Sequence, residues 1–555
     1  MSEDSTSRGV TYAKSFREQF TVRGMIIGSI GAAILTMSSM YVALKLGALP
    51  WPIIFVALVS MFCLKLLGNT NINEINVTHT AMSAGAMTAG GLAFTIPGIY
   101  ILDPTATLSM PALFAVVFGG VILGLIFTAL IRQYFVVTKE LPYPMGQAAA
   151  ETLIVGDEGG KKSVTLFSSL GIAAVFTVIR DWFGKIPATL PANIGGTSLA
   201  AKGVLAGIWL SPMLIGIGYI IGPLFIGVWF LGAIIADFGI VIGGVSMGLW
   251  DGGTAAAIKS SLGIGLMVGT GLGIIVKGII PKAKEIFGPM FSKDAMSSGF
   301  INLRWAPIVM VVLAFIFTVV CDMGIVPSII TIVGVWLATS MSAQIVGQTG
   351  INPMEVFGII ILLAAKAVSS IGQTEAFFVA AVVAIACGLA GDVMNDFKAG
   401  HILHSNPKAQ WLGEMIGGIV GAFVTAGAFY VILAAYGPTA FGNPEMFVAP
   451  QAGAVAAMVG GIPHLTSFLI GLVLGCALYC LNFPVMTLGL GVYLPFYLSA
   501  TAFIGGALKF ITAKVTPEWD KKDTGLIIAS GLLGGEAVVG VIIALIHAVQ
   551  GMSAM

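Results

Sequence analysis

The sequence predicts an all-α fold: a polytopic helical membrane protein with about 16 transmembrane helices. Of its 555 residues, 57% are hydrophobic and only 9% are charged, whereas soluble proteins have about 25% charged residues. A spanning helix needs about 20 mostly apolar residues, so the chain has room for about 16 spans and short connections.

The same composition excludes several functions. The chain has no long hydrophilic insertion and no Gly-x4-Gly-Lys-Ser/Thr loop, so ATP-driven pumping by this chain alone is not expected. The net charge of +1 gives no sign of a nucleic-acid partner. The five cysteines contain no C-x-x-C pair and are expected to serve packing, so neither a cofactor nor a resident metal is predicted.

The apolar runs form two series of eight, separated by a basic segment. The first series covers residues 23–46, 50–67, 75–101, 111–135, 163–183, 202–221, 223–248 and 256–280. The second covers 304–322, 326–346, 354–374, 376–395, 411–436, 448–481, 483–510 and 524–549. Gly460, Gly461 and Pro463 interrupt the run 448–481, which predicts a broken helix: either one span and a half-helix, or two spans.

Basic residues set the expected orientation. Arg8, Lys14, Arg17 and Arg23 predict a cytoplasmic N-terminus, and the first apolar run is expected to be a retained span. The predicted organisation is therefore a cytoplasmic segment (1–22), a first transmembrane half (23–280), a cytoplasmic connecting loop (281–303) and a second transmembrane half (304–555). The side of the C-terminus stays open.

The two halves are weakly similar. Pro144, Gln147 and Glu151 follow the same P-x-x-Q-x-x-x-E spacing as Pro407, Gln410 and Glu414. The polar segment 68–74 has a counterpart at 347–353, which contains Gln348. Repeated halves around a central site are typical of secondary transporters.

Three polar segments are candidate substrate-binding or gating sites. In the first, Glu74, Asn76, Thr78 and His79 begin a helix. Glu74 and Thr78 share one helical face. This segment is either a helix start that presents polar groups to a ligand or a capped, solvated helix end.

The second segment contains Tyr143, Gln147 and Glu151. Two prolines and a glycine precede a stretch too short to span, which indicates a re-entrant or half-helix that lines a cavity, or else an interfacial loop.

The third segment contains Asp392, Asn395, Asp396 and Lys398, followed by His401 and His404. It is interpreted as a gating or positioning element. The alternatives are an interfacial helix end, with Lys398 paired to an aspartate, and a Mg²⁺ or Zn²⁺ site, which we do not predict.

Asp237, Glu375 and Glu536 are the proton-coupling candidates, because each lies alone in an apolar run. Apolar surroundings favour the uncharged carboxyl, and a carboxyl that exchanges protons near neutral pH can couple transport to a proton gradient. The alternative is a structural hydrogen bond, or an ion pair with Lys or Arg.

Several segments together resemble the oligopeptide transporter (OPT) superfamily, and in particular its yellow-stripe-like branch. They are Arg17-Glu18-Gln19-Phe20-Thr21-Val22-Arg23-Gly24, Glu74-Ile75-Asn76-Val77, Tyr143-Pro144-Met145-Gly146-Gln147-Ala148, Asp392-Val393-Met394-Asn395-Asp396-Phe397-Lys398, Pro495-Phe496-Tyr497-Leu498 and Ala529-Ser530-Gly531-Leu532. The resemblance covers nearly the whole chain. It implies about 16 spans and uptake, driven by protons, of short peptides, glutathione-like compounds or metal complexes of amino-acid-derived chelators.

Met145 and Gln147 replace Ser and Thr of the family's loop, so the resemblance does not fix the substrate. The chain lacks the long hydrophilic N-terminal region of plant members, as expected of a prokaryotic-type member.

The expected function is therefore a proton-symporting importer of peptide-like substrates in the cell (inner) membrane, in contact with lipid. Its site would lie near mid-membrane between the halves, bordered by residues 74–87 and 143–151. The alternatives are a passive channel and an intramembrane aspartyl protease, suggested by Gly388-Leu389-Ala390-Gly391-Asp392. A homodimer is left open.

Overall fold

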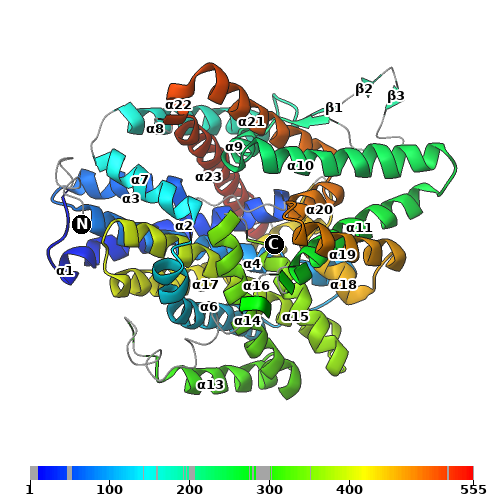
Figure 1. The fold of residues 1–555 in the computed structure, drawn as a ribbon, viewed down its shortest axis with the longest axis horizontal. Helices are drawn as coiled ribbons and strands as arrows, with labels where there is room; N and C mark the ends of the chain where they lie inside the picture. Colours follow the sequence, from blue (N-terminus) through cyan, green and yellow to red (C-terminus); the bar gives the residue numbers. More distant parts are fainter. Residues whose placement is uncertain are drawn as a thin grey trace. The chain divides into compact units, whose positions relative to one another are not determined.

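The computed structural model describes most of the chain as helix (Figure 1). The described residues are 11–46, 53–141, 143–157, 161–191, 193–194, 197–198, 207–273, 276–277, 280–282, 301, 303–349, 352–444, 446–521 and 524–553. The chain forms two compact units. Unit 1 comprises Met1–Ser163, Lys282–Val459 and Ala544–Met555, and unit 2 comprises Val164–Pro281 and Gly460–Ile543. Each unit takes segments from both predicted halves. The division into halves stays a prediction, and most of the loop 281–303 lies outside the described residues.

Unit 1 contains the longest helices. Its elements are α1 (Phe16–Gln19), α2 (Val22–Leu46), α3 (Ile53–Leu67), α4 (Ile72–Ala93), α5 (Gly98–Leu102), α6 (Met110–Arg132) with the π-helix η2 (Gln133–Thr138), α7 (Pro144–Asp157), α13 (Ala306–Val319), α14 (Ile325–Thr349), α15 (Met354–Val368), α16 (Gln373–Ile402), α17 (Pro407–Tyr436), η9 (Pro438–Ala440) and α18 (Pro450–Gly460).

The core of unit 1 surrounds α4 and α16. Every residue of α4 is buried, and α16 is buried from Ala376 to Gly400. Helix α16 packs against α4, α6, α14 and α15. Glycines allow close approach between α4 and α17, since a Cβ on Gly421 would collide with the Cα of Gly85. Two helices buried on all sides can therefore carry polar groups that lipid does not reach.

Unit 2 combines shorter helices with two short strand pairs. Its elements are α8 (Lys161–Thr177) with the π-helix η3 (Val178–Trp182), β1 (Thr189–Pro191), β2 (Asn193–Ile194), β3 (Thr197–Ser198), β4 (Gly207–Trp209), α9 (Pro212–Ile221), α10 (Pro223–Ala233) with the π-helix η5 (Ile234–Gly244), α11 (Gly252–Gly273), η7 (Ile280–Lys282), α19 (Leu465–Cys480), α20 (Val485–Tyr493), α21 (Phe496–Val515), α22 (Pro517–Lys521) and α23 (Thr524–Ser553). β1 pairs antiparallel with β4, with Thr189 opposite Trp209, and β2 pairs with β3. The strands are only two or three residues long, so the predicted all-α class is confirmed.

Among the described residues, nine helices are long and apolar enough to cross a membrane, or up to ten if α18 and α19 are counted as one span. The nine are Phe16–Lys45, Ile72–Leu102, Met110–Thr138, Pro223–Gly244, Gly252–Gly273, Ile325–Gly347, Gln373–Ile402, Pro407–Tyr436 and Phe496–Val515. The predicted number of 16 is not confirmed, because several predicted spans, such as 202–221 and 304–322, contain only short apolar helices. The predicted break near residue 460 is present, since α18 ends at Gly460 and α19 begins at Leu465.

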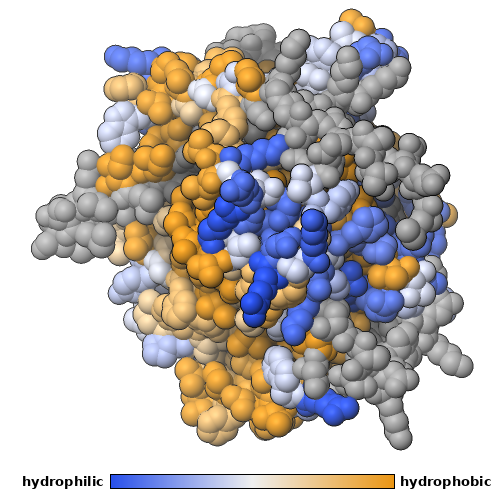
Figure 2. Space-filling view, turned by 90° about the vertical axis from the view of Figure 1, so that its left-hand side faces the viewer, coloured by the Kyte–Doolittle hydropathy of each residue, from blue (hydrophilic) through white to orange (hydrophobic). Residues whose placement is uncertain are grey.

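The surface also fits a membrane protein. In α2, Val22, Ile26, Ile30 and Ile34 are exposed at four-residue intervals, so one side of the helix presents only apolar side chains. Helix α13 exposes Ile308, Val311, Val312, Phe315 and Val319. Figure 2 shows one face on which hydrophilic side chains gather beside broad hydrophobic areas. Such apolar helix faces are stable against lipid rather than water.

Candidate functional site

Helices α4, α16 and α17 bring three carboxyl groups together in the core of unit 1. We call this the acidic cluster: Asp392 and Asp396 of α16 and Glu414 of α17. All three side chains are fully buried, as are His79 and Ser83 of α4 beside them. Asp392 and Asp396 are four residues apart and therefore share one face of α16.

Few hydrogen bonds reach the acidic cluster. The hydroxyl of Ser83 donates to Oδ2 of Asp396 over 2.6 Å. The other oxygen, Oδ1, lies 3.6 Å from Nε2 of His79, and neither imidazole nitrogen has a hydrogen-bond partner. The carboxyls of Asp392 and Glu414 also have none, although both interact electrostatically with Asp396. Buried polar groups are nearly always paired, so this many unpartnered atoms mark the cluster as unusual.

Amide side chains hold the helices around the acidic cluster. Nε2 of Gln410 donates to the main-chain oxygen of Asp396 over 2.7 Å, which ties the start of α17 to α16. The Oε1 atom of the same amide has no hydrogen-bond partner. On another side of α16, Nδ2 of Asn395 donates to the main-chain oxygen of Gly391 over 3.0 Å.

Helix α7 begins against α16 at the level of the acidic cluster. The main-chain N–H of Gly146, in the first turn of α7, donates to Oδ1 of Asn395 over 3.0 Å. A Cβ on Gly146 would collide with the main-chain oxygen of Asn395, so this contact requires glycine. The first N–H groups of a helix lack intrahelical acceptors and carry partial positive charge. The start of α7 therefore contacts α16 at Asn395, one residue before Asp396 in the sequence.

Tyr143 fixes the start of α7. It is fully buried and has a positive φ of 43°, a strained conformation for a residue with a side chain. Its main-chain N–H donates to the oxygen of Gly347 over 2.9 Å, and its hydroxyl donates to the oxygen of Ala343 over 2.9 Å. With 14 residues, α7 is too short to be a spanning helix, as the sequence indicated.

The start of α4 is held by a set of hydrogen bonds and an ion pair. Asn71 caps the helix by accepting the N–H of Glu74 over 2.9 Å. The carboxylate of Glu74, only 1% exposed, accepts two hydrogen bonds of 2.7 Å from Arg23. The hydroxyls of Thr21 and Thr70 donate to it over 2.6 and 2.7 Å. This carboxylate is thus paired within the protein, and a ligand-binding role for it stays a prediction.

The next residues of α4 have fewer partners. Nδ2 of Asn76 donates to the hydroxyl of Ser405 over 3.1 Å, while its Oδ1 is unpartnered. The hydroxyl of Thr78 packs close to Gly24 without a hydrogen bond. Both side chains are completely buried, so the solvated helix end considered from the sequence is not what the structure shows.

The remaining predicted site residues do not join the cluster. Gln147 is exposed, and the side chains of Glu151 and Gln348 lie outside the described residues. Lys398 is 8% exposed and forms no ion pair with Asp392 or Asp396. No group of three or more His, Cys, Asp or Glu residues in the described chain could hold a metal ion.

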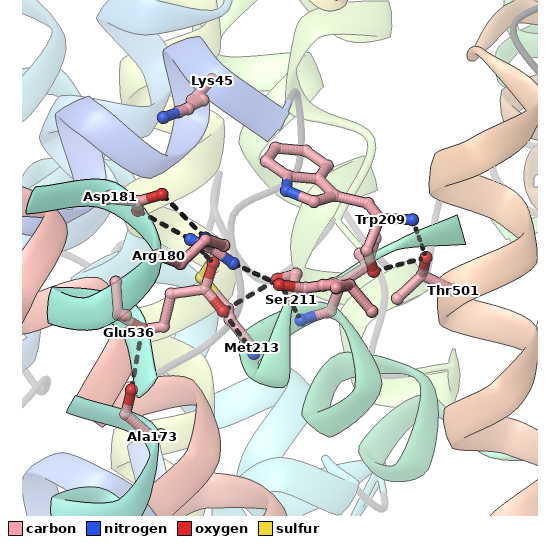
Figure 3. A network of polar contacts seen from close by, with 12 residues as sticks. Lys45, Ala173, Arg180, Asp181, Trp209, Ser211, Met213, Thr501 and Glu536 are labelled. Carbon is pink, nitrogen blue, oxygen red and sulfur yellow. Dashed lines mark hydrogen bonds and ion pairs between the residues drawn. The ribbon is translucent and has the colours of Figure 1, made fainter. Parts of the chain in front are cut away.

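Two of the three proton-coupling candidates form ion pairs in unit 2. Oδ1 of Asp237 lies 2.6 Å from Nζ of Lys259. Figure 3 shows Glu536 in a polar network. Oε1 of Glu536 accepts from Nη2 of Arg180 over 2.7 Å, and Oε2 accepts from the Ser211 hydroxyl and the Met213 N–H over 2.9 and 2.8 Å. The third candidate, Glu375, is half-buried near the start of α16. For the first two, the structure has the ion pair that the sequence left as the alternative.

The chain matches the family described as OPT oligopeptide transporter protein over residues 19–547. It belongs to that family. The match covers both compact units, and the OPT resemblance found in the sequence is confirmed. Members of the OPT family are transporters, so this chain is a membrane transporter rather than an enzyme.

Two curated relatives align over almost their full length. A "Putative oligopeptide transporter" of Haemophilus influenzae is 26% identical over 92% of this chain and 92% of its own. A "Probable metal-nicotianamine transporter YSL6" of Oryza sativa subsp. japonica is 22% identical over 96% of this chain and 92% of its own.

Sequence reasoning did not select Glu414, Gln410 or Ser83 of this OPT chain as site residues. A signal for two of them was present, because Gln410 and Glu414 form the second copy of the P-x-x-Q-x-x-x-E pattern. Ser83 lies in a run of small residues and has no such signal. Its role depends on Asp396, which lies 313 positions along the chain.

Proposed function

We propose that this OPT-family transporter is a secondary active importer that uses an inward proton gradient to take up short peptides or peptide-like metal chelates. We place it in the cell (inner) membrane with a cytoplasmic N-terminus. The observation that carries the proposal is the acidic cluster, because ionisable groups buried in a membrane protein are costly and persist mainly where they act on an ion or substrate.

The substrate class follows from the two relatives. One is named for oligopeptides and the other for a metal complex of nicotianamine, and both align over nearly the whole chain. Short peptides and amino-acid-derived chelators share amine, amide and carboxylate groups, which a polar site can bind by the same hydrogen bonds and charges. In a chelate, the metal ion would be cargo rather than a resident cofactor.

The surroundings of the acidic cluster support a transport role. Transporters commonly place the end of a short helix at the substrate or ion site. Here α7 meets α16 through Gly146 and Asn395, next to Asp396 in the sequence. The helix is held by Tyr143, whose positive φ stores strain that a movement of α7 would release. Movement of α7 would then change access to the cluster.

Uptake into proteoliposomes tests this function. The purified protein is given an imposed inward proton gradient and offered glutathione, a panel of di- to tetrapeptides, and their iron or nickel complexes. The proposal predicts that one ligand accumulates above its outside concentration and that a proton ionophore abolishes the accumulation. Asp392→Asn should abolish the accumulation, whereas Asp103→Asn, which alters an exposed carboxylate beyond α5, should not.

A passive channel predicts another result. The ligand would equilibrate across the membrane without ever exceeding its outside concentration, and the ionophore would have no effect. Such a result would reject active import.

A further inference from the structure

We infer that Asp392, Asp396 and Glu414 together hold the protons that couple transport, and that Asp237 and Glu536 do not. The claim that these protons drive transport rests on the proposed function. The shared protonation of the three carboxyls is a property of the resting protein and can be tested without any substrate.

The first argument is the absence of a compensating cation. All three carboxyls are fully buried on α16 and α17, and no Lys or Arg in the described chain forms an ion pair with any of them. Asp396 has one hydroxyl donor, Ser83, and the other two carboxyls have no donor. Neighbouring buried carboxyls cannot all be ionised, since burial and like charge both favour the protonated form.

The second argument is the position of His79 beside Asp396. It is completely buried, its Nε2 points to Oδ1 of Asp396 at 3.6 Å, and neither ring nitrogen has a hydrogen-bond partner. An imidazole with a free nitrogen at this distance can take or give a proton to the cluster after a small movement. It supplies a second position for a shared proton.

The helices around α16 carry other charged groups. Arg132 of α6 lies over the ring of Phe397 at 5.1 Å. Lys398 follows on α16 itself, and Glu355 of α15 is a further buried carboxyl. Glu74 of α4 is neutralised by Arg23. On α7, the positive end of the helix reaches Asn395. In the described chain, both carboxyl oxygens of Asp392 and of Glu414, and Oδ1 of Asp396, accept no hydrogen bond.

The contrast with unit 2 supports the assignment. Asp237 is paired with Lys259 at 2.6 Å, and Glu536 accepts from Arg180, Ser211 and the Met213 N–H. An adjacent cation and several donors favour the ionised carboxylate. Both carboxyls are thus tied to a basic side chain within the protein, unlike the three carboxyls of the acidic cluster.

Infrared spectroscopy of the purified protein in lipid tests the inference directly. A protonated carboxyl has a C=O stretching band separate from the carboxylate bands. At pH 7 exposed carboxyls are ionised, because their pKa values are about 4, so such a band reports buried protonated groups. The inference predicts this band in the wild-type protein at pH 7. If the wild-type protein lacks this band, the inference is wrong. This test requires no variant.

Variants then assign the band. Asp392→Asn, Asp396→Asn or Glu414→Gln should each change or remove it, whereas Glu536→Gln and Asp237→Asn should leave it unchanged. A band that survives in all three cluster variants, or that disappears with Glu355→Gln, would reject the assignment. The fold of each variant is checked by size-exclusion chromatography. If a variant does not fold, the wild-type spectrum alone tests the inference.

The outcome separates this inference from the proposed function. A cluster-dependent band with no gradient-driven uptake would keep the shared protonation and reject the importer. Gradient-driven uptake without the band would keep the importer and show that its protons bind elsewhere.

Discussion

The main-chain N–H of Gly146 donates to Oδ1 of Asn395 over 3.0 Å and thereby ties the start of α7 to α16. These residues are 249 positions apart, and the acceptor lies between Asp392 and Asp396 in the sequence. The hydrogen bond joins two of the polar segments that the sequence marked as separate candidates. It also gives a structural reason for the amide side chain of Asn395 in an apolar helix.

We expect Gly146→Ala to displace α7 from α16. The added Cβ would collide with the main-chain oxygen of Asn395, and overpacking of this kind costs about 1–3 kcal/mol. Thermal unfolding in detergent should show a lower Tm. Gly171→Ala in α8 is the matched control, because nothing lies within 4 Å of its Cβ. Equal melting temperatures for both variants would show that the Gly146 contact is loose.

Tyr143→Phe removes a single hydrogen bond and keeps the ring. The hydroxyl donates to the main-chain oxygen of Ala343, and the loss of such a buried bond costs about 1–3 kcal/mol. Hydrogen exchange measured by mass spectrometry should show faster exchange at the start of α7. Unchanged exchange there would mean that the Tyr143 N–H bond to Gly347 holds α7 without help from the hydroxyl.

The sequence was sufficient for the fold class and the family, and only partly sufficient for the site. Long apolar runs predicted a helical membrane protein, although the predicted number of spans is not confirmed, and Pro and Gly predicted the break after α18 and the short α7. Contacts between residues far apart in the sequence could not be predicted. Glu536 meets Arg180 from 356 positions away, and periodicity within one helix contains no information about that distance. Helical spacing places Asp392 and Asp396 on one face of α16, but Glu414 joins them only through the packing of α17 against α16.

Glu536→Gln should weaken the fold and leave proton coupling intact. The substitution removes one charge from a buried pair with Arg180, and breaking such pairs costs about 3–5 kcal/mol. Asp181 still accepts two hydrogen bonds from the same guanidinium, which should keep the variant foldable. Denaturation should therefore occur at lower temperature, while uptake keeps its dependence on the proton gradient. Loss of gradient dependence in a folded Glu536→Gln protein would refute this separation of roles.

The start of α11 should loosen in acid. Oδ1 of Asp251 accepts the N–H of Thr254 over 2.9 Å, and its Oδ2 accepts the Thr254 hydroxyl. These bonds hold the pKa of Asp251 below its ordinary value. A carboxyl with a lowered folded-state pKa contributes stability above its unfolded pKa, about 3.9, and that stability is lost as the pH falls through the folded value.

Hydrogen exchange of residues 252–256, corrected for the intrinsic rate at each pH, measures this loss. Protection should be constant from pH 7 to about 5. It should then decrease when the pH is lowered below the ordinary pKa of an aspartate, about 3.9. Asp251→Asn should remove the pH dependence. A pH dependence that persists in that variant would assign the effect to another group.

Proton movement that accompanies substrate is the most direct test of the account. Proteoliposomes containing the protein and an internal pH-sensitive dye are given a transported peptide or chelate from outside, with no imposed gradient. The account predicts that wild-type protein acidifies the interior as substrate enters, and that Asp392→Asn does not. Entry of labelled substrate without any acidification would contradict proton-coupled import.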